Sequence, residues 1–159
     1  MAKEYLNPVA TAEQGIAEYI AEQPSVSGLF GGGAVSVFAA TDENASKLIR
    51  SKIELGLKQC VVVAFTRTNE AGIGDARLPV RATILVSIHS PGLLAEKSMR
   101  ATSDLGAAII ESLHGMQFGT PFVPGYAVKF KSWDYEQDER GKIIARIEFE
   151  AVIYLTNNQ

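Results

Sequence analysis

The sequence predicts an α+β fold: a mostly antiparallel sheet with a long C-terminal hairpin and helices packed on one face. Two observations predict it. Residues 79–90, 126–135 and 142–155 alternate apolar and polar side chains with the period of two that strands have. Amphipathic stretches with helical spacing separate these segments, which gives the order helix, strand, helix, strand, strand, helix, strand, strand. Strands joined as hairpins pair antiparallel, and the helices then cover a face of the sheet.

The composition is that of one ordinary domain. The chain has 159 residues, of which 47% are apolar and 21% charged, and its net charge is −3. We therefore expect a single domain over 1–159, in which 1–40 form a helix and a short strand and 41–159 form the α+β core.

The same numbers exclude several classes of function. One cysteine and two histidines exclude a disulfide framework and a multi-cysteine zinc cluster. Because basic residues form no block, nucleic acid and anionic membranes are not expected as main partners. No apolar run is long enough to span a bilayer, and the N-terminus lacks the hydrophobic core of a signal peptide. We expect a soluble protein made in the cytoplasm, with no membrane partner.

The N-terminal third predicts two helices around a short strand. Thr11, with Gln14 three residues later, is typical of a helix cap, and Pro24 should end this first helix. Gly28–Gly33 predicts a flexible turn, followed by a short strand near Val35 and Phe38. Polar oxygens at Thr41–Asn44 favour the start of a second helix, whose apolar side chains recur at i+4 up to Leu57.

Two strands and a helix are expected in the middle of the chain. The β-branched run Cys60–Phe65 predicts a strand buried on both faces, and the polar residues 66–78 predict a long hairpin loop. Pro79–Ser90 alternates as a strand. The next helix is expected to be capped near Thr102 or Ser103, with an earlier start at Leu93 as the alternative, and to stop at Gly115.

The C-terminal hairpin is the most informative segment. Two alternating runs, 126–135 and 142–155, flank the charged turn 136–141. Alternation places an apolar series from Ile143 to Leu155 on one face of the last strand and Arg146, Glu148 and Glu150 on the other. Lys129 and Lys131 of the partner strand should oppose the two glutamates, with Trp133 and Tyr135 on the same face. Cross-strand charge pairs explain this pattern more simply than paired-carboxylate catalysis does.

Catalytic patterns are weak elsewhere. Gly31-Gly32-Gly33 lacks the lysine and hydroxyl residue of a phosphate loop, so a plain turn is favoured. Cys60 and His89 are expected to be cross-strand neighbours, which is a nucleophile pattern, but Cys60 opens an apolar run where a buried thiol is the simpler interpretation. His114 complements a helix dipole more plausibly than it binds a metal. We expect no enzyme activity, no cofactor and no metal.

The length of the hairpin favours self-association. Strands of ten or more residues exceed the usual five or six, so apolar positions on the hairpin are expected to lack a cover within the chain. Identical neighbours in a ring, or a partner protein, could cover them by strand addition or face packing.

The order of the predicted elements and several short sequence segments resemble those of the tail terminator, or tail completion, proteins of bacteriophage necks and tails. The resemblance covers the chain from about Thr41 onward. It rests on five segments, Ile53-Glu54-Leu55-Gly56-Leu57, Cys60-Val61-Val62-Val63, Pro79 to Ser90, Ile110-Glu111-Ser112-Leu113-His114-Gly115 and Ile147 to Leu155.

The resemblance implies a structural virion protein without catalysis. It implies a ring, usually of six subunits, at the head-proximal end of the tail, where it ends tube polymerisation and presents a surface to the head connector. The partners are then further copies of the chain, the tail tube protein and the connector, with DNA passing through the lumen without sequence-specific binding.

We take charged and aromatic residues of the loop 66–78, the turn 136–141 and the hairpin strands as candidate subunit or partner contacts. They are Glu70, Asp75, Arg77, Lys129, Lys131, Trp133, Arg140, Arg146, Glu148 and Glu150. Three alternatives stay open: another neck-ring protein of head–tail joining, a small ligand-binding or peptide-binding module that uses the polar hairpin face, and a small α+β enzyme.

Overall fold

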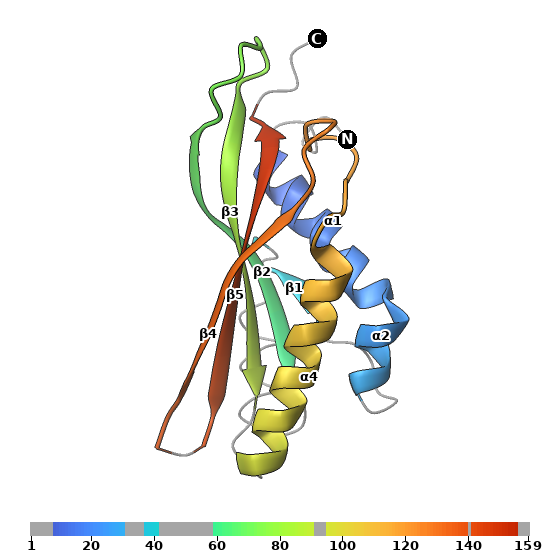
Figure 1. Ribbon diagram of the computed structural model, residues 1–159, viewed down its shortest axis with the longest axis vertical. Helices are drawn as coiled ribbons and strands as arrows, with labels where there is room; N and C mark the ends of the chain where they lie inside the picture. Colours follow the sequence, from blue (N-terminus) through green and yellow to red (C-terminus); the bar gives the residue numbers. More distant parts are fainter. Residues whose placement is uncertain (1–7, 31–36, 42–58, 91–94, 140, 156–159) are drawn as a thin grey trace.

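The chain forms a five-stranded sheet with helices packed against it (Figure 1). The computed structural model describes residues 8–30, 37–41, 59–90, 95–139 and 141–155. The sheet order is β1-β2-β3-β5-β4, in which β1 is parallel to β2 and every other pair is antiparallel. The predicted α+β class is confirmed. The elements are α1 (Pro8–Glu22), α2 (Pro24–Ser27), the 3-10 turn η2 (Gly28–Phe30), β1 (Val37–Ala39), β2 (Cys60–Glu70), β3 (Pro79–Ser90), α4 (Ala95–Leu113), β4 (Lys129–Gln137) and β5 (Ile143–Tyr154).

The N-terminal helix starts before its predicted cap. Because α1 already contains Thr11, the prediction that Thr11 caps it is wrong. Pro8 occupies the first turn, where a missing amide proton removes no helical hydrogen bond. Pro24 ends α1 as expected and opens the short α2. The predicted turn at 31–33 and the helix predicted to follow Thr41 fall on 31–36 and 42–58, which lie outside the described residues.

The strand that begins at Cys60 is longer than predicted. Residues 66–78 were expected to form a loop, but β2 continues to Glu70 and only 71–78 connect it to β3. The ladder passes a register shift between Phe65 and Arg67 and goes on to pair Glu70 with Val80. Pairing with β3 satisfies the backbone there, although Thr66–Glu70 bury no side chain and so show no apolar signal.

The long helix α4 begins at Ala95, which agrees with the earlier of the two predicted starts. Thr102 is therefore no cap: its buried hydroxyl lies 2.6 Å from the hydroxyl of Ser90 at the end of β3. The Gln59 amide donates to both hydroxyls and completes this polar link between sheet and helix. Gly115 follows α4 with φ +86°, the left-handed conformation that the sequence predicted for its stop. None of the described helices is both long and apolar enough to cross a membrane.

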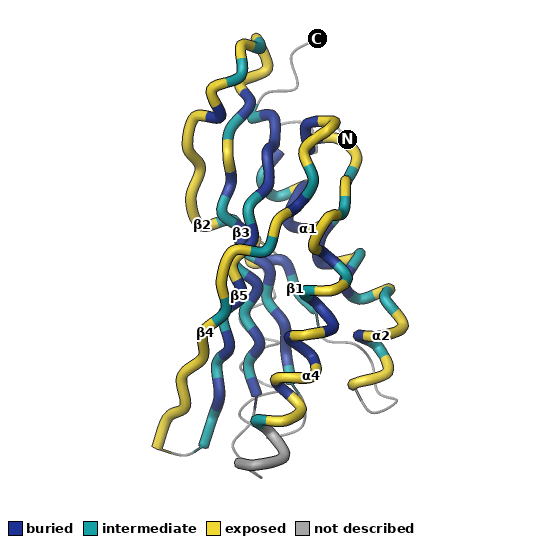
Figure 2. The backbone as a smooth tube through the Cα atoms, in the orientation of Figure 1, coloured by how far each residue is buried: buried dark blue, intermediate teal, exposed yellow. Residues whose placement is uncertain are grey.

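The core lies between the helices and one face of the sheet, which we call the helix face (Figure 2). Alternate residues of β5, predicted to share a face, line it: Ile143, Ala145, Ile147, Phe149, Ala151 and Ile153, each at most 1% exposed. Ile16 and Ile20 of α1 and Leu105 and Ile109 of α4 pack against the sheet and are fully buried.

The expectation that the apolar positions of this hairpin lack a cover within the chain is wrong for β5. Two features of the fold supply the cover. β5 is an interior strand between β3 and β4, and the 19-residue α4 packs against it. The need to cover apolar hairpin side chains is therefore no argument for self-association.

A β-bulge changes the face on which the aromatic residues of β4 lie. Lys129 pairs with Glu150, but the register shifts between Phe130 and Ser132, and Trp133 then pairs with Ile147. Directly paired residues share a face, so Trp133 lies on the helix face. The prediction that Trp133 and Tyr135 share a face with Glu148 and Glu150 is wrong, because strict alternation along β4 ignored the extra residue.

Candidate assembly surface

The face of the sheet opposite the helix face, which we call the second face, carries a group of basic side chains around one carboxylate. Arg67, Thr83, Glu150 and Lys129 form a row of directly paired residues across β2, β3, β5 and β4. Paired residues point to the same side, so Lys129 lies beside Glu150 and Arg67 lies on the same face, one strand further away beyond Thr83.

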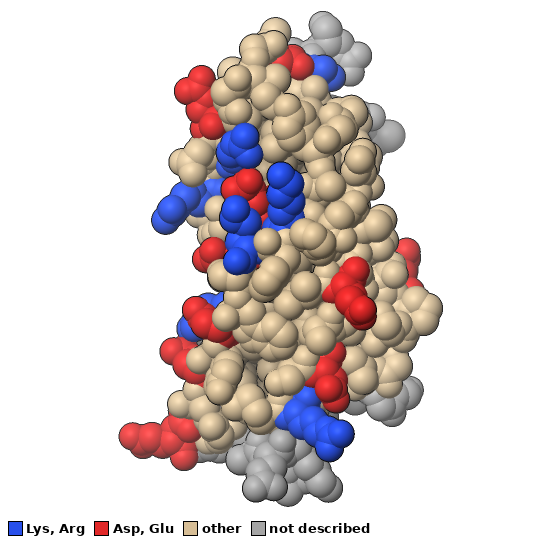
Figure 3. Space-filling model, viewed as in Figure 1, with Lys and Arg blue, Asp and Glu red and all other residues tan. Residues whose placement is uncertain are grey.

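Two further cations complete the group. Arg81 Nη1 donates to Glu150 Oε1 at 3.2 Å, and Lys131 Nζ lies 4.0 Å from Glu150 Oε2. We call Arg67, Arg81, Lys129 and Lys131 with Glu150 the basic patch. Figure 3 shows lysine and arginine side chains around an acidic one on the upper part of the visible face. Four cations lie here with two carboxylates, Glu150 and its neighbour Glu148 on the same face, so this region carries a positive charge in a chain whose net charge is −3.

A cavity of about 320 Å³ opens beside this patch. Its lining includes Arg81, Tyr126, Lys129 and Glu150. Two cations and a tyrosine at one opening are the chemistry that carboxylates and other anions bind.

The cavity lies where the partner of β5 changes from the segment around Phe122 to strand β4. Phe122 forms an isolated bridge with Ile153, while β4 starts pairing only at Lys129 and Glu150. The chain between these two contacts includes Gly125, whose φ of +87° favours glycine, and Tyr126, whose side chain is exposed.

The end of the β4–β5 hairpin is acidic along β4. Asp134, Glu136, Asp138 and Glu139 follow one another, with no lysine or arginine between Lys131 and Arg140. Arg146 of β5 contacts the first two, with Nη1 3.6 Å from Asp134 and Nη2 2.6 Å from Glu136. The Glu136 carboxylate raises the pKa of the Arg146 guanidinium. The exposed carboxylates of Asp134 and Glu136 therefore have one shared counter-charge.

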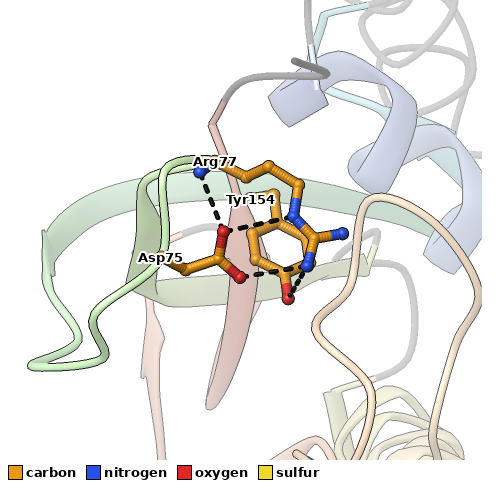
Figure 4. Close-up of polar contacts among 3 residues, drawn as sticks. All are labelled: Asp75, Arg77 and Tyr154. Atoms are coloured by element: carbon orange, nitrogen blue, oxygen red, sulfur yellow. Dashed lines mark hydrogen bonds and ion pairs between the residues drawn. The ribbon is translucent and has the colours of Figure 1, made fainter. Parts of the chain in front are cut away.

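A third charged cluster holds the loop between β2 and β3 against the end of β5 (Figure 4). Arg77 Nε and Nη2 donate to the two carboxylate oxygens of Asp75 at 3.2 and 3.0 Å. Nη2 also donates to the Tyr154 hydroxyl at 2.9 Å, and the guanidinium carbon lies 3.9 Å from the centre of the tyrosine ring. The side-chain hydrogen bond from Arg77, with its backbone amide, lowers the pKa of Asp75 to about 2. The cluster fixes the loop by a bidentate ion pair stacked on an aromatic ring.

This cluster predicts a loss of stability in acid. A carboxyl group with a lowered folded-state pKa stabilises the fold above its unfolded value, near 3.8, and loses that contribution as the pH falls through about 2. The wild-type protein should therefore be more stable than Asp75→Asn at pH 5 and above, and the difference should shrink between pH 4 and pH 2. Thermal unfolding of both proteins over this range measures it. A difference that stays constant down to pH 2 would contradict the lowered pKa.

Cys60 and His89 are direct cross-strand partners, as the sequence predicted. The cysteine side chain is fully buried, which is the environment of an unreactive thiol. Burial, and to a smaller extent the charge of Arg146, lowers the pKa of His89. Among the described residues, no three histidine, cysteine, aspartate or glutamate side chains are placed to hold a metal ion. The two residues are neighbours across the strands, but the thiol is not exposed.

The remaining predicted contact residues are dispersed. Glu70 is exposed at the end of β2. Glu148 lies opposite Ser132, between Arg146 and Glu150 on the second face. Trp133 packs on the helix face, and Arg140 lies outside the described residues. Arg67 and Arg81 are not among the contact residues predicted from the sequence. The alternation of β3 already placed Arg81 on the polar face, whereas Arg67 was assigned to a loop.

Comparisons with known proteins agree with this fold. No protein-family model and no curated protein matches the chain. A chain in the structure "Virion of native gene transfer agent (GTA) particle" aligns with a TM-score of 0.61 and 14% identity, over 92% of this chain and 97% of that one. The two chains share a fold. Two structures from Akkermansia muciniphila align with TM-scores of 0.34 and 0.28 at 13% and 12% identity, over 99% and 100% of this chain and 83% and 94% of theirs. TM-scores this low do not indicate a shared fold.

Proposed function

We propose that this chain is a structural virion protein of a tailed phage or tail-like particle. In this proposal it forms a ring at the head-proximal end of the tail, ends tube polymerisation there and joins the tail to the head connector. The observation that carries the proposal is the fold shared with a gene transfer agent virion chain, because the alignment spans nearly all of both chains. The resemblance of the sequence to tail terminator proteins supports the finer assignment.

The edges of the sheet support assembly from identical copies. Within the described residues, β1 pairs only with Val61–Val63, so the part of β2 from Thr66 to Glu70 has no strand beside it on that edge. β4 is the opposite edge of the sheet. The two edges differ, and contact between unlike surfaces of successive copies closes into a ring when the rotation between copies allows it. We propose a ring of six, in contact with the tail tube protein and the connector, through which DNA passes without sequence-specific binding.

The first test is the assembly state. The purified protein, alone and together with the tail tube protein, is measured by analytical ultracentrifugation and electron microscopy. We expect rings, either in solution or at the end of tubes. A protein that is monomeric in both samples and absent from purified particles overturns the proposal.

The second test separates a terminator from another neck-ring protein. In particles assembled without this chain, a terminator role predicts tubes of non-uniform length and tails that are not joined to heads. Tubes of uniform length with unjoined tails would instead assign the chain to head–tail joining alone. The length distribution of negatively stained tubes is the measurement, and complementation with the wild-type chain is the control.

A further inference from the structure

The two charged regions of the second face have opposite sign, and most members of one lie far from the other within one copy. Lys129 of the basic patch pairs with Glu150, whereas Glu136 of the acidic end pairs with Ile144, six residues away along β5. At about 3.3 Å per residue these positions are about 20 Å apart. Figure 3 shows the same separation, with the basic group high on the visible face and acidic side chains at the lower, projecting end. Glu136 is therefore beyond the reach of Lys129 of the same copy, and a second copy can bring such residues together.

We propose that the basic patch of one copy binds the acidic end of the β4–β5 hairpin of the next copy, so that copies join head to tail. This inference rests on the proposed function, since it names the contact by which the ring forms. The occupant is a second copy of this chain. Its Asp134, Glu136, Asp138 and Glu139 supply the carboxylates, and Arg67, Arg81, Lys129 and Lys131 supply the cations.

The structure of the patch supports a protein carboxylate as its ligand. Arg81 donates to Glu150, so its guanidinium is oriented before a partner arrives, and Lys131 Nζ lies 4.0 Å from the same carboxylate. The cavity of about 320 Å³ beside them is bordered by Lys129 and Tyr126 and is large enough for a side chain. A preorganised group of cations beside a recess fits a projecting acidic hairpin better than a flat surface does.

A simpler role for the acidic residues of β4 is to protect the edge of the sheet. β4 is an edge strand, and charged side chains on an edge prevent unwanted strand addition. Edge protection requires charge of either sign and leaves the segregation of charge along the second face unexplained. Arg140 and Lys142 in the sequence of the turn and Arg146 of β5 offset most of the negative charge of the hairpin end, so we expect a contact of moderate strength that is sensitive to salt.

Charge reversal tests the proposal on the full-length chain. Lys129→Glu with Lys131→Glu reverses the patch, and Asp134→Lys with Glu139→Lys reverses the hairpin end. Each double variant should weaken self-association by about tenfold or more, because close charge pairs across an interface couple strongly. Mixing the two variants should restore assembly, since acidic patches then meet basic hairpins and basic patches meet acidic ones. Arg100→Glu and Glu111→Lys, exposed on α4, are the control charge reversals of each sign and should assemble like the wild type.

Association is measured by analytical ultracentrifugation at low and at high salt, and circular dichroism checks that each variant folds. Lys129→Gln with Lys131→Gln replaces the patch reversal if the latter unfolds. Rings that form unchanged in every variant overturn this inference and leave the proposed function standing. A wild-type chain that never assembles, alone or on tubes, overturns both. Patch variants that assemble normally but lose binding to double-stranded DNA would show that the patch binds nucleic acid, and the hairpin contact would be wrong.

Discussion

Replacing Gly106 by alanine should destabilise the protein, although alanine is the better helix former. Gly106 lies in α4, and a Cβ atom there would come within 2.5 Å of Cη2 and 2.8 Å of Cζ2 of Trp133. The indole is rigid and packs against the core, so either the ring or the helix must move. Overpacking of this kind costs about 1–3 kcal/mol, which exceeds the gain in helix propensity of about 1 kcal/mol. We expect a net loss of up to about 2 kcal/mol in the free energy of unfolding by denaturant.

Gly15 provides the matched control. It also lies inside a helix, α1, and a Cβ there meets nothing within 4 Å. Gly15→Ala should therefore stabilise the protein by about 0.5–1 kcal/mol. Trp133 is the only tryptophan of the chain, so its fluorescence reports the displacement directly. Gly106→Ala should shift the emission and Gly15→Ala should not. Equal stabilisation by both substitutions, with unchanged emission, would show that the contact between Gly106 and Trp133 is absent.

Removing the carboxylate of Glu13 should have the largest effect on stability. The side chain, 3% exposed, accepts hydrogen bonds from the backbone amides of Phe65 at 2.8 Å and Thr41 at 3.1 Å. It therefore ties α1 to β2 beside the bulge and to the residues that follow β1. Glu13→Ala leaves two amides without their acceptor, and each such loss costs about 1–3 kcal/mol. We expect a loss of about 2–4 kcal/mol in the free energy of unfolding.

Glu13→Gln and Glu18→Ala test the reason for this loss. Glutamine keeps one acceptor oxygen, so its effect should lie between those of alanine and the wild type. Glu18 is exposed on the same helix, and its removal should change stability by less than about 0.5 kcal/mol. Hydrogen exchange at the Phe65 amide should become faster in Glu13→Ala only. The assignment fails if Glu13→Ala and Glu18→Ala unfold at the same denaturant concentration.

The sequence by itself determined the class of the fold and the orientation of its two longest strands. In β3 and β5 every second residue is apolar, and those residues are buried as the alternation predicted, apart from the half-buried Val80. The pairing of Cys60 with His89 followed from the same information, because a hairpin between two recognisable strands fixes which ends meet. Patterns of this kind are local, so they can be seen along the chain.

Other features of the protein depend on contacts between strands and helices, and only the tertiary structure decided them. The bulge at Lys131 turned Trp133 toward α4, and the extension of β2 brought Arg67 into a row with Glu150. Glu13 reads as one more polar helix residue until its position over the Phe65 amide is known. Register shifts and buried hydrogen-bond acceptors are set by the partner strand or helix, and the local sequence pattern of one segment does not identify that partner. For this reason the sequence predicted the sheet and several of its charged residues, whereas their assembly into one basic patch came from the fold.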